Sequence, residues 1–146
     1  MNRTSKPLLI LLVIATMALM SCGKKGPPFL PESDLSLRVD GLTGSWEEGS
    51  VDLVGRVQDD MKQASDVSGC KVYHAWYPMD DPPCEGCPVE VTELQEKTGN
   101  VITKGRFRCR IQIREKRGIH FFQVRLVGKN GVLGPVSNRV KLKIDD

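Results

Sequence analysis

The chain has little excess charge and no apolar run long enough for a transmembrane helix. Its 21 Lys and Arg side chains stand against 18 Asp and Glu, and two of the positive ones, Arg3 and Lys6, lie near the N-terminus. This near balance excludes a strongly electrostatic nucleic-acid binder. The apolar run at residues 8–20 has 13 residues, fewer than the roughly 20 that a membrane-spanning helix needs. A length of 146 residues excludes a TIM barrel or a two-domain Rossmann enzyme.

Motifs that carry catalysis or hold cofactors are also missing. No Ser lies in a nucleophile-elbow context, and no Gly-rich phosphate loop is present. The acidic pairs at 59–60 and 80–81 do not repeat the spacing of a calcium loop. The two histidines, His74 and His120, alternate with apolar neighbours, so we expect them in the core. The sequence therefore predicts a protein that is not an enzyme, with no catalytic residue, metal site or cofactor.

Most of the chain alternates between apolar and polar residues with a period of two, which is typical of β-strands with one buried face. The 14 Gly and 9 Pro residues also favour a β fold rich in turns. No window has a helical stripe, although residues 59–64 could form one turn. We therefore predict an all-β, seven-stranded, two-sheet sandwich over residues 35–146. The strands are expected at 35–39, 51–57, 70–76, 89–91, 107–113, 122–126 and 136–144.

The N-terminus has the pattern of an exported protein. Arg3 and Lys6 precede the apolar run, which ends in Leu-Met-Ser-Cys at residues 19–22. These four residues resemble the bacterial lipobox, a family in which the Cys thiol is lipidated, the chain is cut before it and the new amine is acylated. The resemblance implies a lipoprotein signal peptide at 1–21, lipidation of Cys22 and a Pro/Gly tether at 22–34. In that family the thiol carries a diacylglycerol and the amine a third acyl chain. These three chains exceed the two anchoring signals that stable membrane attachment requires.

A second motif follows the lipobox. Residues 22–31 read Cys-Gly-Lys-Lys-Gly-Pro-Pro-Phe-Leu-Pro. They resemble the Cys-Gly-x-Lys-Gly-Pro motif that opens small lipoproteins of the lipopolysaccharide-transport maturation (LptM) type. The alternative, compatible with the first, is a stiff spacer. The resemblance implies docking on the outer-membrane lipopolysaccharide translocon, and the candidate docking residues are Gly23, Lys25, Gly26, Pro27, Phe29 and Pro31. Gly23 also resembles the sorting signal for the outer membrane in enteric bacteria.

Two segments of the predicted sandwich resemble bacterial fibronectin type III domains. Residues 67–73, Val-Ser-Gly-Cys-Lys-Val-Tyr, are similar to the third strand of that family. Residues 122–138 are similar to its sixth strand, the following turn and the final strand. The resemblance implies a binding or spacing module, because such domains are seldom catalytic. Fold-level similarity does not define a function by itself.

Four cysteines remain beside Cys22, and an even number outside the cytoplasm indicates disulfides. Three connectivities are open. Cys70 and Cys109 lie on inward positions of strands expected in opposite sheets, while the spacing of Cys84 and Cys87 permits a local bridge. We favour pairing 70–109 and 84–87. The alternatives for Cys84 and Cys87 are a redox dithiol or a zinc site. Further ligands of such a zinc site would be His74 with His120 or Cys70.

The densest positive charge lies on the predicted fifth strand. Arg106, Arg108 and Arg110 project from one face and could meet anionic lipid headgroups or lipopolysaccharide phosphates. The competing interpretation is a solvated face whose charges protect an edge strand from aggregation. Tyr73 and Tyr77 could also form an aromatic contact patch with Trp46 or Trp76.

Together these features predict a lipid-anchored envelope lipoprotein of a Gram-negative bacterium, at the outer membrane and facing the periplasm. Its sandwich is expected to bind or scaffold another envelope protein without catalysis, and the chain is not expected to bind nucleic acid. Two alternatives remain. The first is an assembly helper for the lipopolysaccharide-transport machinery. The second is a thiol-redox or metal-binding accessory that acts through Cys84 and Cys87.

Overall fold

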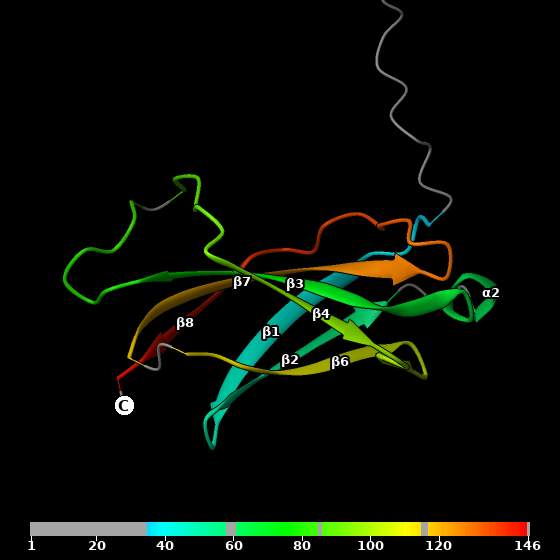
Figure 1. The fold of residues 1–146 in the computed structure, drawn as a ribbon, viewed down its shortest axis with the longest axis horizontal. Helices are drawn as coiled ribbons and strands as arrows, with labels where there is room; N and C mark the ends of the chain where they lie inside the picture. The colour runs from blue at the N-terminus through cyan, green and yellow to red at the C-terminus, as the bar shows by residue number, and fades with distance from the viewer. Residues whose placement is uncertain (1–34, 58–60, 85, 115–116, 146) are drawn as a thin grey trace, which may run out of the picture. The chain divides into compact units, whose positions relative to one another are not determined.

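A computed structural model describes residues 35–57, 61–84, 86–114 and 117–145. The predicted signal peptide, Cys22, the candidate docking residues and the tether lie outside these ranges. Within them the chain forms two four-stranded antiparallel sheets packed as a sandwich (Figure 1). The described residues contain no helix with the length and apolar character needed to cross a bilayer.

Each sheet combines strands from both halves of the sequence. The first sheet has the order β1-β2-β6-β5 and the second the order β4-β3-β7-β8. The first consists of β1 (Val39–Glu47), β2 (Ser50–Val57), β6 (Arg106–Gln112) and β5 (Ile102–Thr103). The second consists of β4 (Glu93–Thr98), β3 (Val67–Tyr77), β7 (Gly118–Gly128) and β8 (Val140–Ile144). One helical turn, α2 (Met61–Ala64), connects β2 to β3.

The predicted all-β, two-sheet sandwich is confirmed, but strand positions differ from the prediction. Eight strands are described instead of seven, because the short β5 was not expected. The predicted strand at 89–91 is wrong: this segment is a loop, and β4 follows it at Glu93–Thr98. β4 lacks the apolar–polar alternation of the other strands. Its inward positions carry Glu93, Gln95 and Lys97, which line an open edge of the sandwich instead of the core.

The predicted first and last strands also begin too early. Leu35 and Leu37 are buried but precede β1, and the strand runs instead through Gly41, where a turn was expected. The β1–β2 register shifts between Asp40 and Thr43, and Gly41 has φ 58°, so a bulge replaces the turn. At the other end β8 begins only at Val140.

The core lies between the two sheets. Alternate residues of β2, β3, β6 and β7 supply most of it, and buried residues of β1, β8 and the segment before β1 add to it. Its largest fully buried apolar side chains are Phe107, Phe122, Leu53, Ile111 and Leu126. Asn138 joins the two sheets at one edge, because its amide donates to Leu42 O (2.9 Å) and accepts from Leu42 N (2.7 Å). Gly69 is required where β4 meets β3, since a Cβ there would overlap the carbonyl oxygen of Lys97.

Shortening one core side chain tests this arrangement. Leu53 is fully buried, whereas the next residue, Val54, is 38% exposed on the outer face. Leu53→Ala should lower the free energy of unfolding by about 2–5 kcal/mol, because it removes apolar burial and leaves a cavity. Val54→Ala, the matched control, should change it by less than about 1 kcal/mol. Urea denaturation checks both, and equal losses would contradict the assigned faces of β2.

Candidate functional site

The candidate site is an open groove between the edges of the two sheets, where β4 faces β6. Its volume is about 740 Å³. Gln95 crosses the groove, because its Nε2 donates to Gln112 O (2.7 Å) and to Glu93 Oε1 (3.2 Å). Most of the lining side chains are polar or charged, so the groove suits a hydrogen-bonding ligand. They are Ser50, Glu93, Gln95, Lys97, Arg110, Gln112, Ile113 and Arg114.

Asp52 on β2 gathers two of the three arginines predicted to contact anions. Its carboxylate is 4% exposed and accepts hydrogen bonds from Arg110 Nε and Nη2 (both 2.6 Å) and from Arg108 Nη2 (3.1 Å). These arginines, Arg110 first, lower the pKa of Asp52 to about 2, against the opposing effect of desolvation. Arg110 also lies 3.7 Å from Glu47. The face is therefore less positive than the three arginines alone would make it.

The third arginine of this group lies at the far end of the same face. Arg106 pairs in register with Arg56 of β2, so two like charges stand side by side. Within the described ranges neither side chain forms an ion pair. The structure thus places the three predicted arginines on one face, with Arg108 and Arg110 held by Asp52 and Arg106 beside Arg56.

The Asp52 interactions predict a pH dependence. Its pKa is depressed in the folded chain, so its stabilising effect is present above the pKa of an unfolded Asp, about 3.9. That effect is lost as pH falls from about 4 to about 2. Asp52→Asn should lower the melting temperature at pH 7 and flatten the acid side of the stability curve.

Thermal unfolding followed by circular dichroism across this pH range measures both effects. Asp66→Asn is the control, because Asp66 is an exposed partner of Lys129 at 3.8 Å. A melting temperature that responds equally to both substitutions would contradict the role of Asp52.

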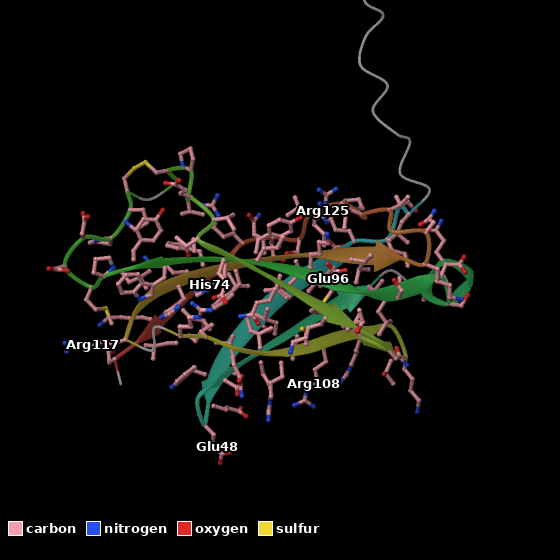
Figure 2. The ribbon with its side chains drawn as sticks, viewed as in Figure 1. Glu48, His74, Glu96, Arg108, Arg117 and Arg125 are labelled. Atoms are coloured by element: carbon pink, nitrogen blue, oxygen red, sulfur yellow. A yellow bond between two sulfur atoms is a disulfide. The ribbon has the colours of Figure 1, made fainter. Side chains whose placement is uncertain are left out.

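Cys84 and Cys87 are joined by a disulfide in the long loop between β3 and β4 (Figure 2). Three residues of this loop are tied to the second sheet or its flank: Cys87 O accepts from Arg139 Nη1 (3.1 Å), Glu90 N donates to Tyr77 Oη (3.1 Å), and Thr92 N donates to His74 O (2.9 Å). The Arg139 guanidinium also lies 6.0 Å from the centre of the Phe121 ring. The bridge therefore constrains a loop that rests on an aromatic and cationic part of the sheet.

Cys70 and Cys109 differ from the predicted pairing. They lie on β3 and β6, in opposite sheets as expected, but the structure contains two buried free thiols and no 70–109 bridge. The two sulfur atoms are not bonded, whereas a bridge requires a sulfur–sulfur distance of about 2.05 Å. The neighbouring Cys109 thiol and burial raise the pKa of the Cys70 thiol.

This burial predicts low thiol reactivity. In the native chain Cys70 and Cys109 should resist iodoacetamide at neutral pH, because the reagent needs an accessible thiolate. In urea both should be alkylated, which mass spectrometry of the digested chain would show. A Ser45→Cys variant on β1, in the same sheet as Cys109, supplies an accessible control thiol, because Ser45 is exposed. Protection of both cysteines even in urea would show that they are bridged, and rapid native labelling would contradict their burial.

The two histidines lie in the core, as expected. His74 Nε2 and His120 Nδ1 are 2.9 Å apart, and His74 Nδ1 is 3.3 Å from Glu93 Oε2. The His74 ring stacks on Phe122 with centroids 4.7 Å apart. No group of three His, Cys, Asp or Glu side chains placed to hold a metal occurs in the described ranges, so the structure does not assemble the zinc set considered above.

The predicted aromatic patch is divided by the structure. Tyr73 and Tyr77 are on the outer face of β3, and Tyr77 meets Phe121 edge-on at 6.0 Å, a neighbour that the sequence did not indicate. Trp76 points to the opposite face, and its Nε1 donates to Arg117 O (3.0 Å). Trp46 belongs to β1 in the other sheet and packs against the core. Neither Trp joins the tyrosines: Trp76 faces away from them because successive residues of a strand face opposite sides, and Trp46 lies in the other sheet.

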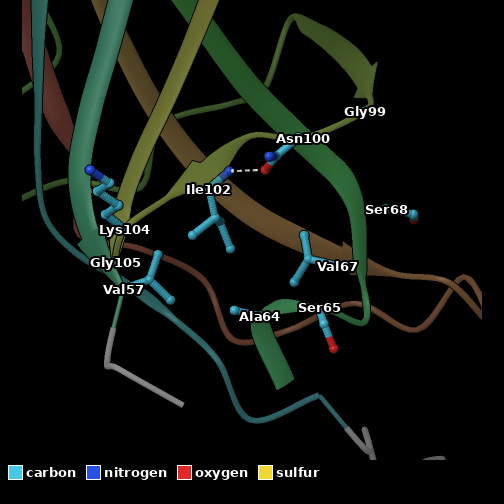
Figure 3. Close-up of a pocket in the computed structure, with 10 residues that line it drawn as sticks. All are labelled: Val57, Ala64, Ser65, Val67, Ser68, Gly99, Asn100, Ile102, Lys104 and Gly105. Carbon is cyan, nitrogen blue, oxygen red and sulfur yellow. Dashed lines mark hydrogen bonds between the residues drawn. The ribbon is translucent and has the colours of Figure 1, made fainter. Parts of the chain in front are cut away.

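A second cavity lies beside α2, at one end of the sandwich (Figure 3). It has a volume of about 650 Å³. Val57, Val67 and Ile102 supply its apolar surface, and Ile102 N donates to Asn100 Oδ1 (3.1 Å). Its Ser68 hydroxyl already donates to Val127 O and Gly128 O. The lining of this cavity contains one charged residue, Lys104, whereas four charged side chains line the groove between β4 and β6, which is therefore the stronger candidate site for a polar ligand.

No family model and no curated protein matches the chain. Among solved structures, it is similar to one described as a myokine structure. The two are 15% identical with a TM-score of 0.48, over 75% of this chain and 97% of that one. It is also similar to part of pectate lyase Pel3 from Pectobacterium carotovorum, at 14% identity and a TM-score of 0.37, over 72% of this chain and 26% of that one. At these values neither structure bears on function.

The sequence did not identify the groove or the role of Asp52. Its signal was present but indirect: one acidic residue in an apolar strand, and arginines at every second position of another. Their pairing depends on the β2–β6 register, which sets Asp52 opposite Arg110.

Proposed function

We propose that this chain is a lipid-anchored envelope lipoprotein of a Gram-negative bacterium. Cys22 carries the lipid, residues 22–34 form the tether, and the sandwich faces the periplasm from the outer membrane. The lipobox-like residues 19–22 support the anchor, and Gly23 supports the outer-membrane destination. The resemblance to fibronectin type III domains supports a module that binds rather than catalyses.

The sandwich would act as a non-enzymatic binding or scaffolding domain for another envelope protein. The observation that carries this proposal is the groove between β4 and β6. It combines the positive side chains of Lys97, Arg110 and Arg114 with the amide groups of Gln95 and Gln112. A polar, open groove of this kind can hold a protein segment by hydrogen bonds and charge.

The motif at residues 22–31 supports a second candidate, assistance in assembling the lipopolysaccharide translocon. Its docking residues would be Gly23, Lys25, Gly26, Pro27, Phe29 and Pro31. Transfer of residues 1–31 to an inert domain separates the two candidates. If the translocon copurifies with the transferred segment, the motif carries the interaction; if it copurifies only with the full chain, the sandwich does.

The anchor is tested by changing the acylated residue. Cys22→Ala should abolish incorporation of labelled palmitate and leave the signal peptide uncleaved, because the thiol is the acceptor of the first lipid. Ser21→Ala is the matched control and should be labelled normally, since it keeps a small residue before Cys22. Gel fluorescence and intact mass measure both. Undiminished labelling of Cys22→Ala would refute the proposed anchor.

In-cell crosslinking of the full chain tests the binding role. Crosslinks from the sandwich to one envelope protein are expected, and those at Lys97 would place the partner at the groove. If crosslinks come only from Lys24 and Lys25, the partner docks on the tether and the proposed role of the sandwich is wrong.

A further inference from the structure

The fourth strand position of the first sheet is only partly filled. β5 pairs with β6 through two residue pairs, Ile102↔Phe107 and Thr103↔Arg106. One more hydrogen bond joins Arg108 N to Val101 O (2.9 Å). The residues just before Val101 belong to the other sheet, where Gly99 N donates to Ser68 O (2.8 Å). Among the described residues, no strand lies beside the remainder of β6 on this side.

The open part of β6 presents its backbone to the groove. Backbone groups of alternate residues in a strand point the same way, so Arg110 and Gln112 are directed to the same side as Arg108. One of these groups, Gln112 O, accepts a hydrogen bond from the Gln95 side chain (2.7 Å). A side chain from the opposite sheet thus already substitutes for part of a missing strand.

Side chains beside the open edge define what could pair with it. On the outer face Arg108 and Arg110 project with 70% and 55% of their side chains exposed, and Arg110 also lines the mouth of the groove. Asp52 accepts one hydrogen bond from Arg108 and two from Arg110, which leaves further guanidinium donors. On the groove side the lining includes Ile113, Lys97 and Arg114, with Glu93 held near His74. A pairing strand would meet cations outside and a mixed aliphatic and cationic surface inside.

We propose that β6 binds an extended segment of a partner protein by strand addition, continuing the row begun by β5. The segment alternates acidic residues, which face Arg108 and Arg110, with aliphatic residues, which face Ile113. Cross-strand pairs of opposite charge stabilise such an addition, and main-chain hydrogen bonds give it affinity. This inference rests on the proposed binding role and names the partner's chemistry.

A second copy of this chain is the less suitable occupant. Antiparallel pairing of β6 with itself would bring the outer-face arginines of two chains together, and directly opposed like charges are destabilising. The same arginines blunt edge-to-edge association, as charged residues on exposed edges do in other sheets. The charge therefore selects an acidic partner and disfavours self-association.

The test uses the purified full chain in detergent and a fluorescein-labelled peptide, Glu-Val-Glu-Val-Glu-Val. Fluorescence anisotropy should show saturable binding, and hydrogen exchange should slow at the Arg110 and Gln112 amides. Gln112→Pro should weaken binding by about tenfold or more, because it removes an edge N–H where proline is tolerated. Arg108→Gln should also weaken it, because it removes one of the two positive charges that face the acidic residues of the peptide. Lys143→Glu, on β8 of the other sheet, is the control and should bind normally.

Three results would overturn the proposal. The first is equal binding by Gln112→Pro and the control when thermal unfolding shows that both are folded. The second is tighter binding of the matched Lys-Val peptide, and the third is a change of oligomeric state in Gln112→Pro, which would identify a second copy as the occupant. The assay does not use the lipid anchor. If the peptide does not bind but Cys22 is acylated and the sandwich crosslinks to an envelope protein, strand addition alone is refuted. If Cys22 is not acylated or the sandwich does not crosslink, the proposed function is refuted.

Discussion

The antiparallel ladder between β3 and β7 is the centre of the second sheet, and the strands on either side of it are positioned by it. It runs from Val67↔Gly128 to Tyr77↔Ile119 and joins segments about fifty residues apart in sequence. β4 attaches to the free side of β3 and β8 to the free side of β7, which completes the second sheet. The ladder sets His74 beside Phe122 in the core, and it ends at Tyr77, where the stapled loop leaves the sheet. β4 in turn pairs with β3 in the register Val72↔Gln95 and His74↔Glu93, which directs its polar face toward β6.

The first sheet has a buried carboxylate, Asp52, and an exposed edge on β6. Arg108 and Arg110 bind the carboxylate and also lie beside the edge. Burying the Asp52 carboxylate is unfavourable unless charged partners compensate, and Arg108 and Arg110 provide that compensation from the neighbouring strand. Their aliphatic stems and remaining donors stay at the surface, next to a sheet edge that β5 covers only in part. The part of the β6 edge that β5 leaves open is thus flanked by charged side chains instead of by another strand.

Periodicity alone predicted the parts of the fold that bury every second residue. β2, β3, β6 and β7 each place an apolar side chain in the core at alternate positions, so their sequence pattern was sufficient. β4 was not predicted because its inward residues are polar and line the groove. β1 was placed too early because Gly41, expected in a turn, forms a bulge within the strand. The contacts Asp52–Arg110 and His74–His120 span 58 and 46 residues and depend on strand register. A period of two does not fix register between distant strands, so these contacts were not predictable.

The position of Cys70 and Cys109 has a consequence for how folding can be followed. Each sulfur belongs to a different sheet, and the two meet only in the interior between them. Formation of either sheet alone would leave its thiol on a solvent-facing surface. Shielding of the pair from water therefore coincides with the docking of the two layers, and the chain carries an internal marker of sandwich closure. Since β3 and β6 are far apart in sequence, this marker would register a comparatively slow event.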